Sequence, residues 1–450
     1  MQFPKQYQGR YFYHFTHIDN IASIVEQDGL LSTNEKNKRG IKHHNIANID
    51  IQNRRKTMAV PVGPKGFVHD YVPFYFTSIN PMLLGLLNRK VIDQPYICFL
   101  AIPIEKLLEE SAIFTDASAN TELAPNFYSD PNDLDQLNWD LINSRKWREL
   151  DDDDRHARMA EVLIYKKVPL EWIETYIVFN DIGEKKIRQC YKEAGLRSPM
   201  ISGNWFNNVP FFFTKFCFSD RKRETLVTGP IQLYQEYENL LRNIINKRND
   251  YIPENSLFYD IEDALSHIGS NFRILPELDG IYQLETDNEV HHETVSDHTL
   301  RVVRMLESSC FFSQLGNKSQ NIVRLCAYLH DIGKGPKEKW SNEIQKAYPD
   351  HPADAIPMLE RILTEEFTVL SEKEIQRICL LVVYHDLMGD IIYKGRSIQE
   401  LFNLNLSKKE LIMLAAITEA DIEAICKGWT WELAEKLDSL IDQALKEAQD

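Results

Sequence analysis

The spacing of apolar residues changes near the middle of the chain, from a pattern typical of strands to one typical of helices. In the first half, short apolar runs bounded by turn-forming residues favour β-strands. One of them, residues 96–103 (YICFLAIP), is continuously apolar and predicts a strand buried on both faces. The other predicted strands are residues 11–17, 72–78, 160–165 and 174–179.

One helix and two long loops are predicted between these strands. The helix follows the first strand, with Asp19 as its candidate N-cap and Gly29 at its end, because the apolar residues between them have helical spacing. Residues 30–48 and 115–154 show neither the alternation of a strand nor the apolar spacing of a helix, and each segment predicts a loop. Loops of this length are usually functional or disordered.

From Ile231 onward the apolar residues recur every three to four positions and predict a helical domain. The Ser407–Glu410 pair has capping-box spacing and predicts the start of one helix. The predicted helices are residues 231–247, 300–306, 322–329, 375–384, 411–425 and a last one beginning at Trp431.

The two periods together predict an α+β protein. Its N-terminal domain has a mixed β core and its C-terminal domain is all-α. The change of period lies between Asn208 and Gln232. We therefore expect domains at residues 1–212 and 213–450, each long enough to bury its own core.

Composition indicates an ordinary protein of a reducing compartment. No apolar run reaches the roughly 18–20 residues that span a bilayer, and the first residues lack the apolar core of a signal peptide. The cysteines are scattered without a CxxC pair and are interpreted as buried thiols, so we expect a cytoplasmic protein without a membrane partner. They are Cys98, Cys190, Cys217, Cys310, Cys326, Cys379 and Cys426.

Net charge narrows the possible nucleic-acid partners. A formal charge of −16 argues against general affinity for duplex DNA, whose phosphates an acidic surface repels. One segment, residues 36–65, is basic, with only Asp50 to offset its cations. It is either a solvated loop, as most charge runs are, or a local surface for anions such as a single strand.

A set of histidines and aspartates in the second half predicts a metal centre. His330 and Asp331 end an apolar helix, where a bare carboxylate would cost several kcal/mol to bury unless it were paired or metal-bound. Such residues suit one or two divalent ions among Mn, Fe, Ni, Zn and Mg. The candidate ligands are His298, His330, Asp331, His351, His385 and Asp421.

The order H…HD…D, at His298, His330–Asp331 and Asp421, resembles the HD phosphohydrolase superfamily. The resemblance covers about residues 275–425 and implies a metal-dependent hydrolase of nucleotide phosphate esters. His351 and His385 are similar to the extra histidines of members that hold two metals. Lys334, which follows the HD pair, is the candidate to balance phosphate charge, and metal would lower the pKa of a bound water toward 7.

The N-terminal half offers few acid–base groups. It has no Ser-His-Asp set and no Gly-rich phosphate loop, and its candidates are spread over four fragments. A β core with one strand-borne glutamate suits a substrate that carries its own leaving group, as NAD carries nicotinamide. The candidates are His14, Thr16, Arg54, Arg55, Tyr71, Tyr75 and Glu161.

The fragments HFTHIDN, IQNRR, VHDYVPFYF…PML and AEVLIY resemble the DarT family of DNA ADP-ribosyltransferase toxins. The resemblance covers about residues 11–206. It implies transfer of ADP-ribose from NAD to a base, typically thymine, in single-stranded DNA. The acceptor could equally be RNA. In that family the usual partner is a macrodomain antitoxin, which nothing in this sequence resembles.

The resemblance also implies a role for each candidate. His14 and Thr16 would bind the ribose and the nicotinamide amide of NAD. Tyr71 or Tyr75 would stack on nicotinamide. Glu161 would be the catalytic glutamate.

The catalytic arginine would be Arg54 or Arg55, and adjacency leaves the choice open. Arginine stays protonated, so we expect it to hold pyrophosphate or an ionising base rather than to act as a base. The sequence departs from the family at Ile79-Asn-Pro-Met82, where contacts to the acceptor are expected to differ.

Two other interpretations remain. In one, the HD domain is a nucleotide phosphohydrolase regulated by an N-terminal domain that only senses NAD or a nucleotide. In the other, both domains are nucleic-acid-binding modules without activity. An intact Glu161 and a complete metal set favour two enzymes on one chain.

Overall fold

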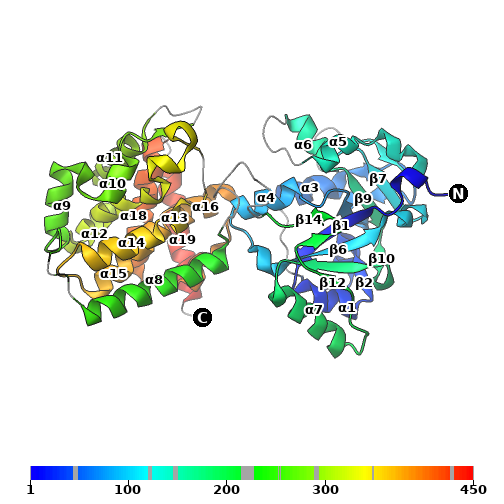
Figure 1. The fold of residues 1–450 in the computed structure, drawn as a ribbon, viewed down its shortest axis with the longest axis horizontal. Coiled ribbons are helices and arrows are strands. Elements are labelled where there is room, and N and C mark those ends of the chain that lie inside the picture. The colour runs from blue at the N-terminus through cyan, green and yellow to red at the C-terminus, as the bar shows by residue number, and fades with distance from the viewer. Residues whose placement is uncertain are drawn as a thin grey trace. The chain divides into compact units, whose positions relative to one another are not determined.

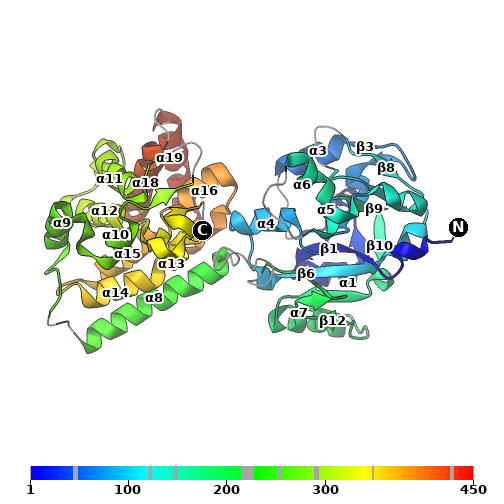
Figure 2. The ribbon, with the colours of Figure 1, turned by 45° about the horizontal axis from the view of Figure 1, so that its top comes forward.

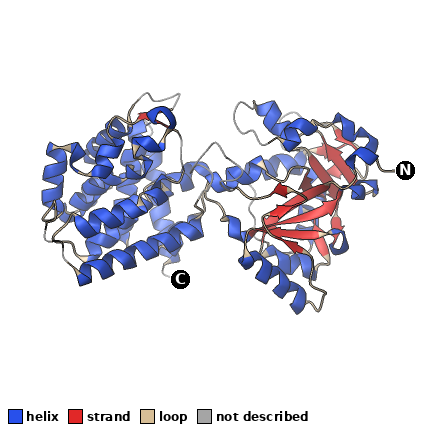
Figure 3. Cartoon of the chain, in the orientation of Figure 1, coloured by secondary structure: helices blue, strands red, loops and turns tan. Residues whose placement is uncertain are grey.

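The structure consists of two compact units with different secondary structure. This computed structural model describes residues 2–448, except 44–48, 120–123, 145–150, 214–227, 252, 254, 288–292, 347–348 and 426–429. The first unit is Met1–Leu87 with Ile92–Leu226, and the second is Asn88–Val91 with Val227–Asp450. Strands are concentrated in the first unit, whereas the second is almost wholly helical (Figure 3). Among the described helices, none combines the length and apolar character needed to cross a membrane.

An eight-stranded sheet forms the centre of the first unit, in the order β12-β11-β6-β1-β5-β9-β7-β8. The continuously apolar strand β6 is buried along nearly its whole length and pairs with β1 and β11. The bounds are β1 Tyr11–His17, β5 Tyr71–Tyr75, β6 Ile97–Pro103, β7 Ala112–Thr115, β8 Phe127–Tyr128, β9 Glu161–Tyr165, β11 Thr175–Val178 and β12 Ile201–Ser202. All five strands predicted from the sequence are present.

Strand register brings distant motifs together. Tyr13 on β1 lies opposite Tyr75 on β5, and Tyr75 lies opposite Glu161 on β9. Because side chains alternate between the two faces of a strand, residues two apart on one strand lie on one face. The fragments HFTHIDN, VHDYVPFYF and AEVLIY contribute β1, β5 and β9, so they lie side by side in the sheet.

Short helices cover this sheet and fill the segments predicted as loops. Helices α1 (Asn20–Glu26) and α7 (Asp181–Glu193) lie side by side in both views (Figures 1 and 2). Asp19 occupies the N-cap position of α1, but its side chain makes no capping hydrogen bond. The further short elements are β2 Gly29–Leu31, α2 Thr33–Lys38, α3 Ile49–Thr57, η2 Val68–Asp70, α4 Pro81–Asn88, η5 Pro131–Gln136, α5 Trp139–Asn143 and α6 Asp152–Arg158.

The prediction of two long loops is therefore wrong for much of both segments. Helix α2 has six residues and no buried side chain, and it is started by Ser32, whose Oγ accepts a hydrogen bond from Glu35 N. A polar helix this short leaves no apolar period for the sequence to reveal. The prediction is correct for residues 39–43, 116–119 and 124–126, which are neither helix nor strand, and residues 44–48, 120–123 and 145–150 lie outside the described residues.

The second unit is a bundle of helices around one apolar core. The long helix α8 runs along α14 and α15 (Figure 2). The predicted helices correspond to α8 Pro230–Asp250, α11 Val295–Met305, α12 Asn317–Leu329, α15 Glu372–Val383, α18 Lys408–Ile425 and α19 Thr430–Glu447. Helices without a sequence prediction are α9 Ile261–Ser270, α10 Pro276–Ile281, α13 His351–Asp354, α14 Ile356–Glu365, α16 Leu387–Lys394 and α17 Ile398–Asn403.

Two smaller predictions can also be compared with the structure. The Ser407–Glu410 capping box is present, since each residue accepts a hydrogen bond from the other's backbone N–H. Cys98, Cys190, Cys326 and Cys379 are buried free thiols, but Cys310 is exposed, so that part of the cysteine prediction is wrong. Cys217 and Cys426 lie outside the described residues.

Candidate functional site

A buried ion pair joins two of the fragments singled out in the N-terminal half. Arg55 Nη1 and Nη2 donate to Glu161 Oε1 and Oε2, both at 2.9 Å. Glu161 is fully buried, and its Oε1 also accepts a hydrogen bond from the backbone N–H of Ala119 at 3.0 Å. Burial alone would lower the pKa of Arg55, but the charge of Glu161 more than offsets it and the pKa is raised. Two parallel bonds fix the carboxylate and the guanidinium in one plane.

The structure distinguishes the two adjacent arginines. Both are carried by α3, but Arg55 is buried and Arg54 is exposed. Successive residues of a helix point about 100° apart, so only one of the two can face Glu161. Arg55 is thus the arginine at the site.

His14 and Thr16 lie on one face of β1, two residues apart. His14 Nδ1 donates a hydrogen bond to Pro73 O at 2.8 Å, which leaves Nε2 free to accept one. Burial lowers the pKa of His14 to about 4, so the imidazole is neutral at pH 7. Thr16 Oγ1 accepts a hydrogen bond from Asn20 Nδ2 at 2.9 Å. This face therefore offers neutral hydrogen-bonding groups.

The two candidate tyrosines have different surroundings. Tyr71 donates its hydroxyl to Lys65 O at 2.8 Å, and its ring packs against Tyr165 at a centroid distance of 5.2 Å. Tyr75 is the cross-strand partner of Glu161 and donates its hydroxyl to Met82 Sδ at 3.1 Å. Burial raises the pKa of Tyr75 well above its usual value. Tyr75 is thus the tyrosine beside the buried ion pair.

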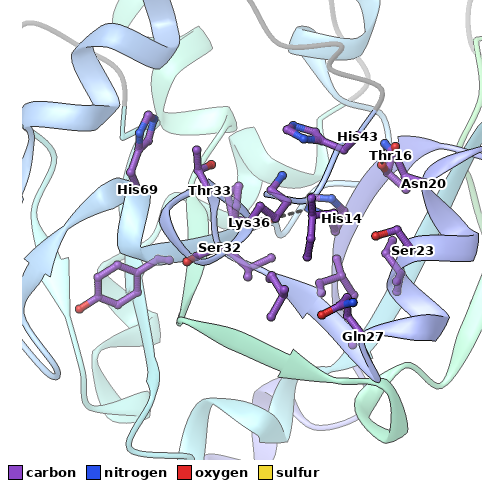
Figure 4. A pocket seen from close by; sticks show the side chains of 18 of the residues that line it. His14, Thr16, Asn20, Ser23, Gln27, Ser32, Thr33, Lys36, His43 and His69 are labelled. Atoms are coloured by element: carbon purple, nitrogen blue, oxygen red, sulfur yellow. Dashed lines mark hydrogen bonds between the residues drawn. The ribbon is translucent and has the colours of Figure 1, made fainter. Parts of the chain in front are cut away.

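A cavity of about 370 Å³ collects most of these groups. Figure 4 shows side chains from β1, α1 and α2 arranged around it. Its lining includes these predicted residues: His14, Thr16, Arg55, Tyr71 and Tyr75. Glu161 is not in the lining and reaches the cavity through Arg55. Met82, in the segment that departs from the family pattern, is also part of the wall.

Asn20 and His69 are among the polar residues of this cavity that sequence reasoning missed. Asn20 holds Thr16, and it was already part of the HFTHIDN fragment, four residues from Thr16. His69 lines the cavity, and its Nε2 is buried without a hydrogen-bond partner. In the aromatic fragment His69 is followed directly by Asp70, and this His-Asp pair was the signal that could have identified it.

In the second unit, the six predicted ligands come together from five helices. His298 Nε2 lies 2.8 Å from Asp421 Oδ1, which joins α11 to α18. His351 Nε2 lies 3.4 Å from Asp331 Oδ1 and 3.1 Å from His385 Nε2. Asp331 is 1% exposed. The cluster is therefore buried and dense in ligand atoms.

The histidine rings are oriented by the helix ends that carry them. His330 Nδ1 donates to Ala327 O and His385 Nδ1 donates to Val382 O, both at 2.8 Å. Each backbone bond fixes the tautomer and leaves Nε2 for a ligand, as in metal sites. His330 Nε2 and Asp331 Oδ1 are buried without a hydrogen-bond partner. These orphaned atoms fit a cation.

Two overlapping groups have the spacing needed for metal ions. In each group the ligand atoms lie within 4.8 Å of one another. One group is His298, His330 and Asp331, and the other is Asp331, His351 and His385. Asp331 belongs to both groups.

The pKa values of two neighbouring histidines shift in opposite directions when no metal is bound, although the nearby carboxylates raise both. Burial lowers the pKa of His330, but Asp331 and Asp421 raise it to about 9. Burial lowers the pKa of His351 to about 3, which the nearby Asp386 only partly offsets. His351 is therefore neutral at pH 7, as a metal ligand must be.

Asp386 is a further acidic residue of this cluster that sequence reasoning missed. Its Oδ2 lies 3.4 Å from His351 Nε2, and its Oδ1 lies 3.6 Å from His385 Nε2. The signal was present in the sequence, because His385–Asp386 is a second His-Asp pair at the end of an apolar helix. The two pairs end helices α12 and α15, which pack together.

Lys334 lies beside the carboxylate shared by the two groups. Its Nζ donates to Asp331 Oδ2 at 2.6 Å. Burial would lower the pKa of Lys334, but Asp331 raises it, so the side chain stays charged. It is placed to stabilise an anion at the cluster.

Comparisons with known proteins match each half of the chain separately. Residues 13–208 match the family described as ssDNA thymidine ADP-ribosyltransferase, DarT, and residues 295–422 match the HD domain family. A DNA ADP-ribosyl transferase of Thermus sp. (strain 2.9) is 32% identical over 202 residues, which cover 43% of this chain and 94% of that protein.

Two further relatives were found. A solved structure, Thermus sp. 2.9 DarT in complex with ADP-ribosylated ssDNA, is 28% identical with a TM-score of 0.40, and the match covers 45% of this chain and 96% of that one. A bifunctional uridylyltransferase/uridylyl-removing enzyme of Cereibacter sphaeroides is 27% identical over 193 residues, which cover 38% of this chain and 19% of that protein.

Proposed function

The chain belongs to the DarT family and also carries an HD domain, and on this basis we propose that it is a double enzyme. The first activity is transfer of ADP-ribose from NAD to a base, thymine in the first instance, of single-stranded DNA. The second is metal-dependent hydrolysis of a nucleotide phosphate ester. Each activity has its own site within one unit.

The observation that carries the transferase proposal is the buried Arg55–Glu161 pair beside the cavity. A fully buried carboxylate with three donors on it is rigid and keeps its charge close to the cavity. Such a preorganised charge stabilises an oxocarbenium-like transition state better than a mobile one. The intact pair also argues against a domain that only senses NAD.

Each remaining residue of the cavity then has a role in the reaction. The glycosidic bond to nicotinamide breaks and its electron pair leaves with nicotinamide, while the ribose carbon forms a new bond to the acceptor base. Glu161 stabilises the positive charge on the ribose, and Arg55 stabilises the negative charge on the base as the base loses its proton to solvent water. His14 Nε2 accepts from a ribose hydroxyl, Thr16 with Asn20 holds the amide, and Tyr75 stacks on nicotinamide.

The acceptor enters from the side of the exposed basic residues. Lys42, Arg54 and Lys56 are exposed, and they belong to the basic segment predicted to attract a single strand. A duplex is a poorer acceptor, because presenting an unstacked base costs a few kcal/mol. RNA remains an alternative acceptor, and an assay with both kinds of oligonucleotide decides between them.

The transferase proposal is tested by incubating the full chain with NAD and single-stranded oligonucleotides, followed by mass spectrometry. We expect a mass gain of one ADP-ribose on thymine-containing DNA, and a loss of at least about 100-fold in rate for Glu161→Gln and Arg55→Lys. Arg54→Lys is the matched control and should retain most of the rate. No modification of any DNA or RNA would favour the sensor interpretation.

For the second unit, we propose that the cluster binds two divalent ions that share Asp331. His298, His330 and Asp421 would hold one ion, and His351, His385 and Asp386 the other. When bound, such ions lower the pKa of a coordinated water and polarise the phosphoryl oxygens. The Lys334 ammonium would stabilise the phosphate charge. The orphaned His330 Nε2 and Asp331 Oδ1 support this assignment.

Metal content tests the assignment independently of activity. We expect two equivalents of metal per wild-type chain, and one equivalent after either His298→Ala or Asp386→Asn. The matched control is Asp390→Asn. It removes a carboxylate of α16, the helix that follows Asp386, and this carboxylate pairs with Lys394 at 2.8 Å. Two equivalents in Asp386→Asn would remove that residue from the site.

A phosphate ester is the proposed substrate of the second unit because of the chemistry of the His/Asp cluster. Two ions clamp the attacking and leaving oxygens of a phosphodiester or pyrophosphate. One relative is named as an enzyme that removes a uridylyl group, and this name supports the class. We expect the chain to release a nucleoside monophosphate from dinucleotide esters. This activity should be lost when the metal is chelated and in Asp331→Ala.

A further inference from the structure

The cavity of the first unit is cationic although the chain as a whole is acidic. The formal net charge is −16. Among the described residues that line the cavity, none is Asp or Glu, whereas Lys36 and Arg55 both belong to the lining. A site with this balance favours an anionic ligand.

Only one of these two cations has its charge balanced by the protein. Arg55 is bound at both nitrogens by Glu161. Within the described part of the chain, no carboxylate forms an ion pair with Lys36, and burial alone accounts for the lowered pKa of its ammonium group. Both cations line the same cavity as His69.

Lys36 also differs from the basic residues that follow it on α2 and just after. Its side chain lies in the cavity near His14, whose pKa it lowers (Figure 4). Lys38 is exposed and donates to Glu35 Oε1 at 2.8 Å, and Arg39 donates to Gln27 Oε1 at 3.1 Å. Lys38 lies two residues after Lys36 on the helix and so points about 200° away from it, and Arg39 follows the end of α2 with an exposed side chain.

We infer that Lys36 binds the diphosphate of NAD and so determines the affinity of the cavity for the ADP-ribose donor. This inference rests on the proposed transferase function. A phosphate of the DNA backbone is the other anion within reach, but a strand keeps its phosphates on the surface, whereas Lys36 is turned into the cavity beside the ribose-binding His14. Lys36 is a positioning residue and takes no part in bond making.

The consequence is a change in binding with little change in chemistry. A charge-assisted hydrogen bond to phosphate is equal in the bound donor and in the transition state, so its loss raises KM and leaves kcat nearly constant. We expect Lys36→Met to raise the KM for NAD about 10- to 100-fold and to change kcat less than about threefold. Lys36→Arg should restore most of the affinity.

Calorimetry on the full chain separates the two possible phosphates. The probes are ADP-ribose, nicotinamide riboside, which has no phosphate, and a single-stranded oligonucleotide. Lys36→Met should weaken binding of ADP-ribose about 10- to 100-fold and leave the other two affinities within about threefold. Lys38→Met, on the same helix, is the matched control and should bind ADP-ribose normally.

Three outcomes would overturn the inference. Weaker binding of the oligonucleotide with normal binding of ADP-ribose would assign Lys36 to the DNA strand. Equal loss for ADP-ribose and nicotinamide riboside would mean that the substitution deforms the cavity. If the wild-type chain bound neither NAD nor ADP-ribose, the transferase proposal would fail first, and the role of Lys36 with it.

Discussion

His14 is a half-buried base in the cavity wall, and its protonation couples the proposed donor site to stability. Its imidazole donates to Pro73 O and stays neutral, because burial lowers its pKa to about 4. In the unfolded chain the same group titrates near 6.5. Between these two values the unfolded chain binds a proton that the folded chain does not, so stability is full above about pH 6.5 and falls as the pH decreases toward 4.

Substitution of His14 should therefore flatten the pH dependence of stability. Between pH 7 and pH 5, protonation of His14 in the unfolded chain should lower the free energy of unfolding of the wild-type protein by up to about 2 kcal/mol. His14→Gln should not show this decrease. The measurement is the midpoint of thermal unfolding at both pH values. An equal shift in both proteins would show that His14 is protonated in the folded state as readily as in solution.

At the scale of elements, the geometry of the His/Asp cluster depends on the close approach of two short helices. The 3-10 helix η10 (Ile332–Lys334) follows the first His-Asp pair, and α13 begins with His351. A Cβ added at Gly333 would lie 1.9 Å from His351 O and 2.8 Å from Ala355 N. Only glycine allows this approach, which sets the distance from Asp331 to His351.

Gly333→Ala should push η10 and α13 apart. We expect a loss of about 1–3 kcal/mol in the stability of the second unit and loss of the ion held by His351. Thermal unfolding and metal content report the two effects. Gly269→Ala, in α9 with nothing within 4 Å of the added Cβ, is the control and should be neutral or slightly stabilising. Two metal equivalents in Gly333→Ala would refute the distance argument.

At the scale of the whole molecule, one chain joins a DarT domain to an HD domain. A DNA-modifying toxin activity needs restraint in its own cell. An HD domain that hydrolyses nucleotide esters or pyrophosphates is suited to destroy the donor or the adduct. We propose that it acts as an internal antitoxin, and this proposal rests on the fusion alone.

The antitoxin proposal predicts the effect of Asp331→Ala in a host cell. The full chain should become more toxic, because hydrolysis is lost while transfer continues. Growth after induced expression is the measurement, and Asp331→Ala combined with Glu161→Ala should be harmless. Unchanged or lower toxicity of Asp331→Ala would make the HD domain a second effector that acts on nucleotides.

Local pattern in the sequence predicted part of the elements of both halves. Alternation and apolar runs predicted five strands of the central sheet, and helical spacing predicted seven helices, since both depend on which face of an element is buried. The predicted DarT and HD families are confirmed by the comparisons. The His and Asp residues of the HD cluster were found because charged groups at the end of an apolar helix require partners.

Only the tertiary structure shows which of two adjacent residues enters a site and which residues far apart in the sequence come into contact. Arg55 rather than Arg54 meets Glu161, which is 106 positions away, because the phase of α3 and its packing select one residue. Asp386 joins the cluster because α15 ends beside α12, and Lys36 points into a cavity because α2 turns it inward. Short polar helices such as α2 leave no period in the sequence, so their orientation is fixed only by the contacts that they make in the folded chain.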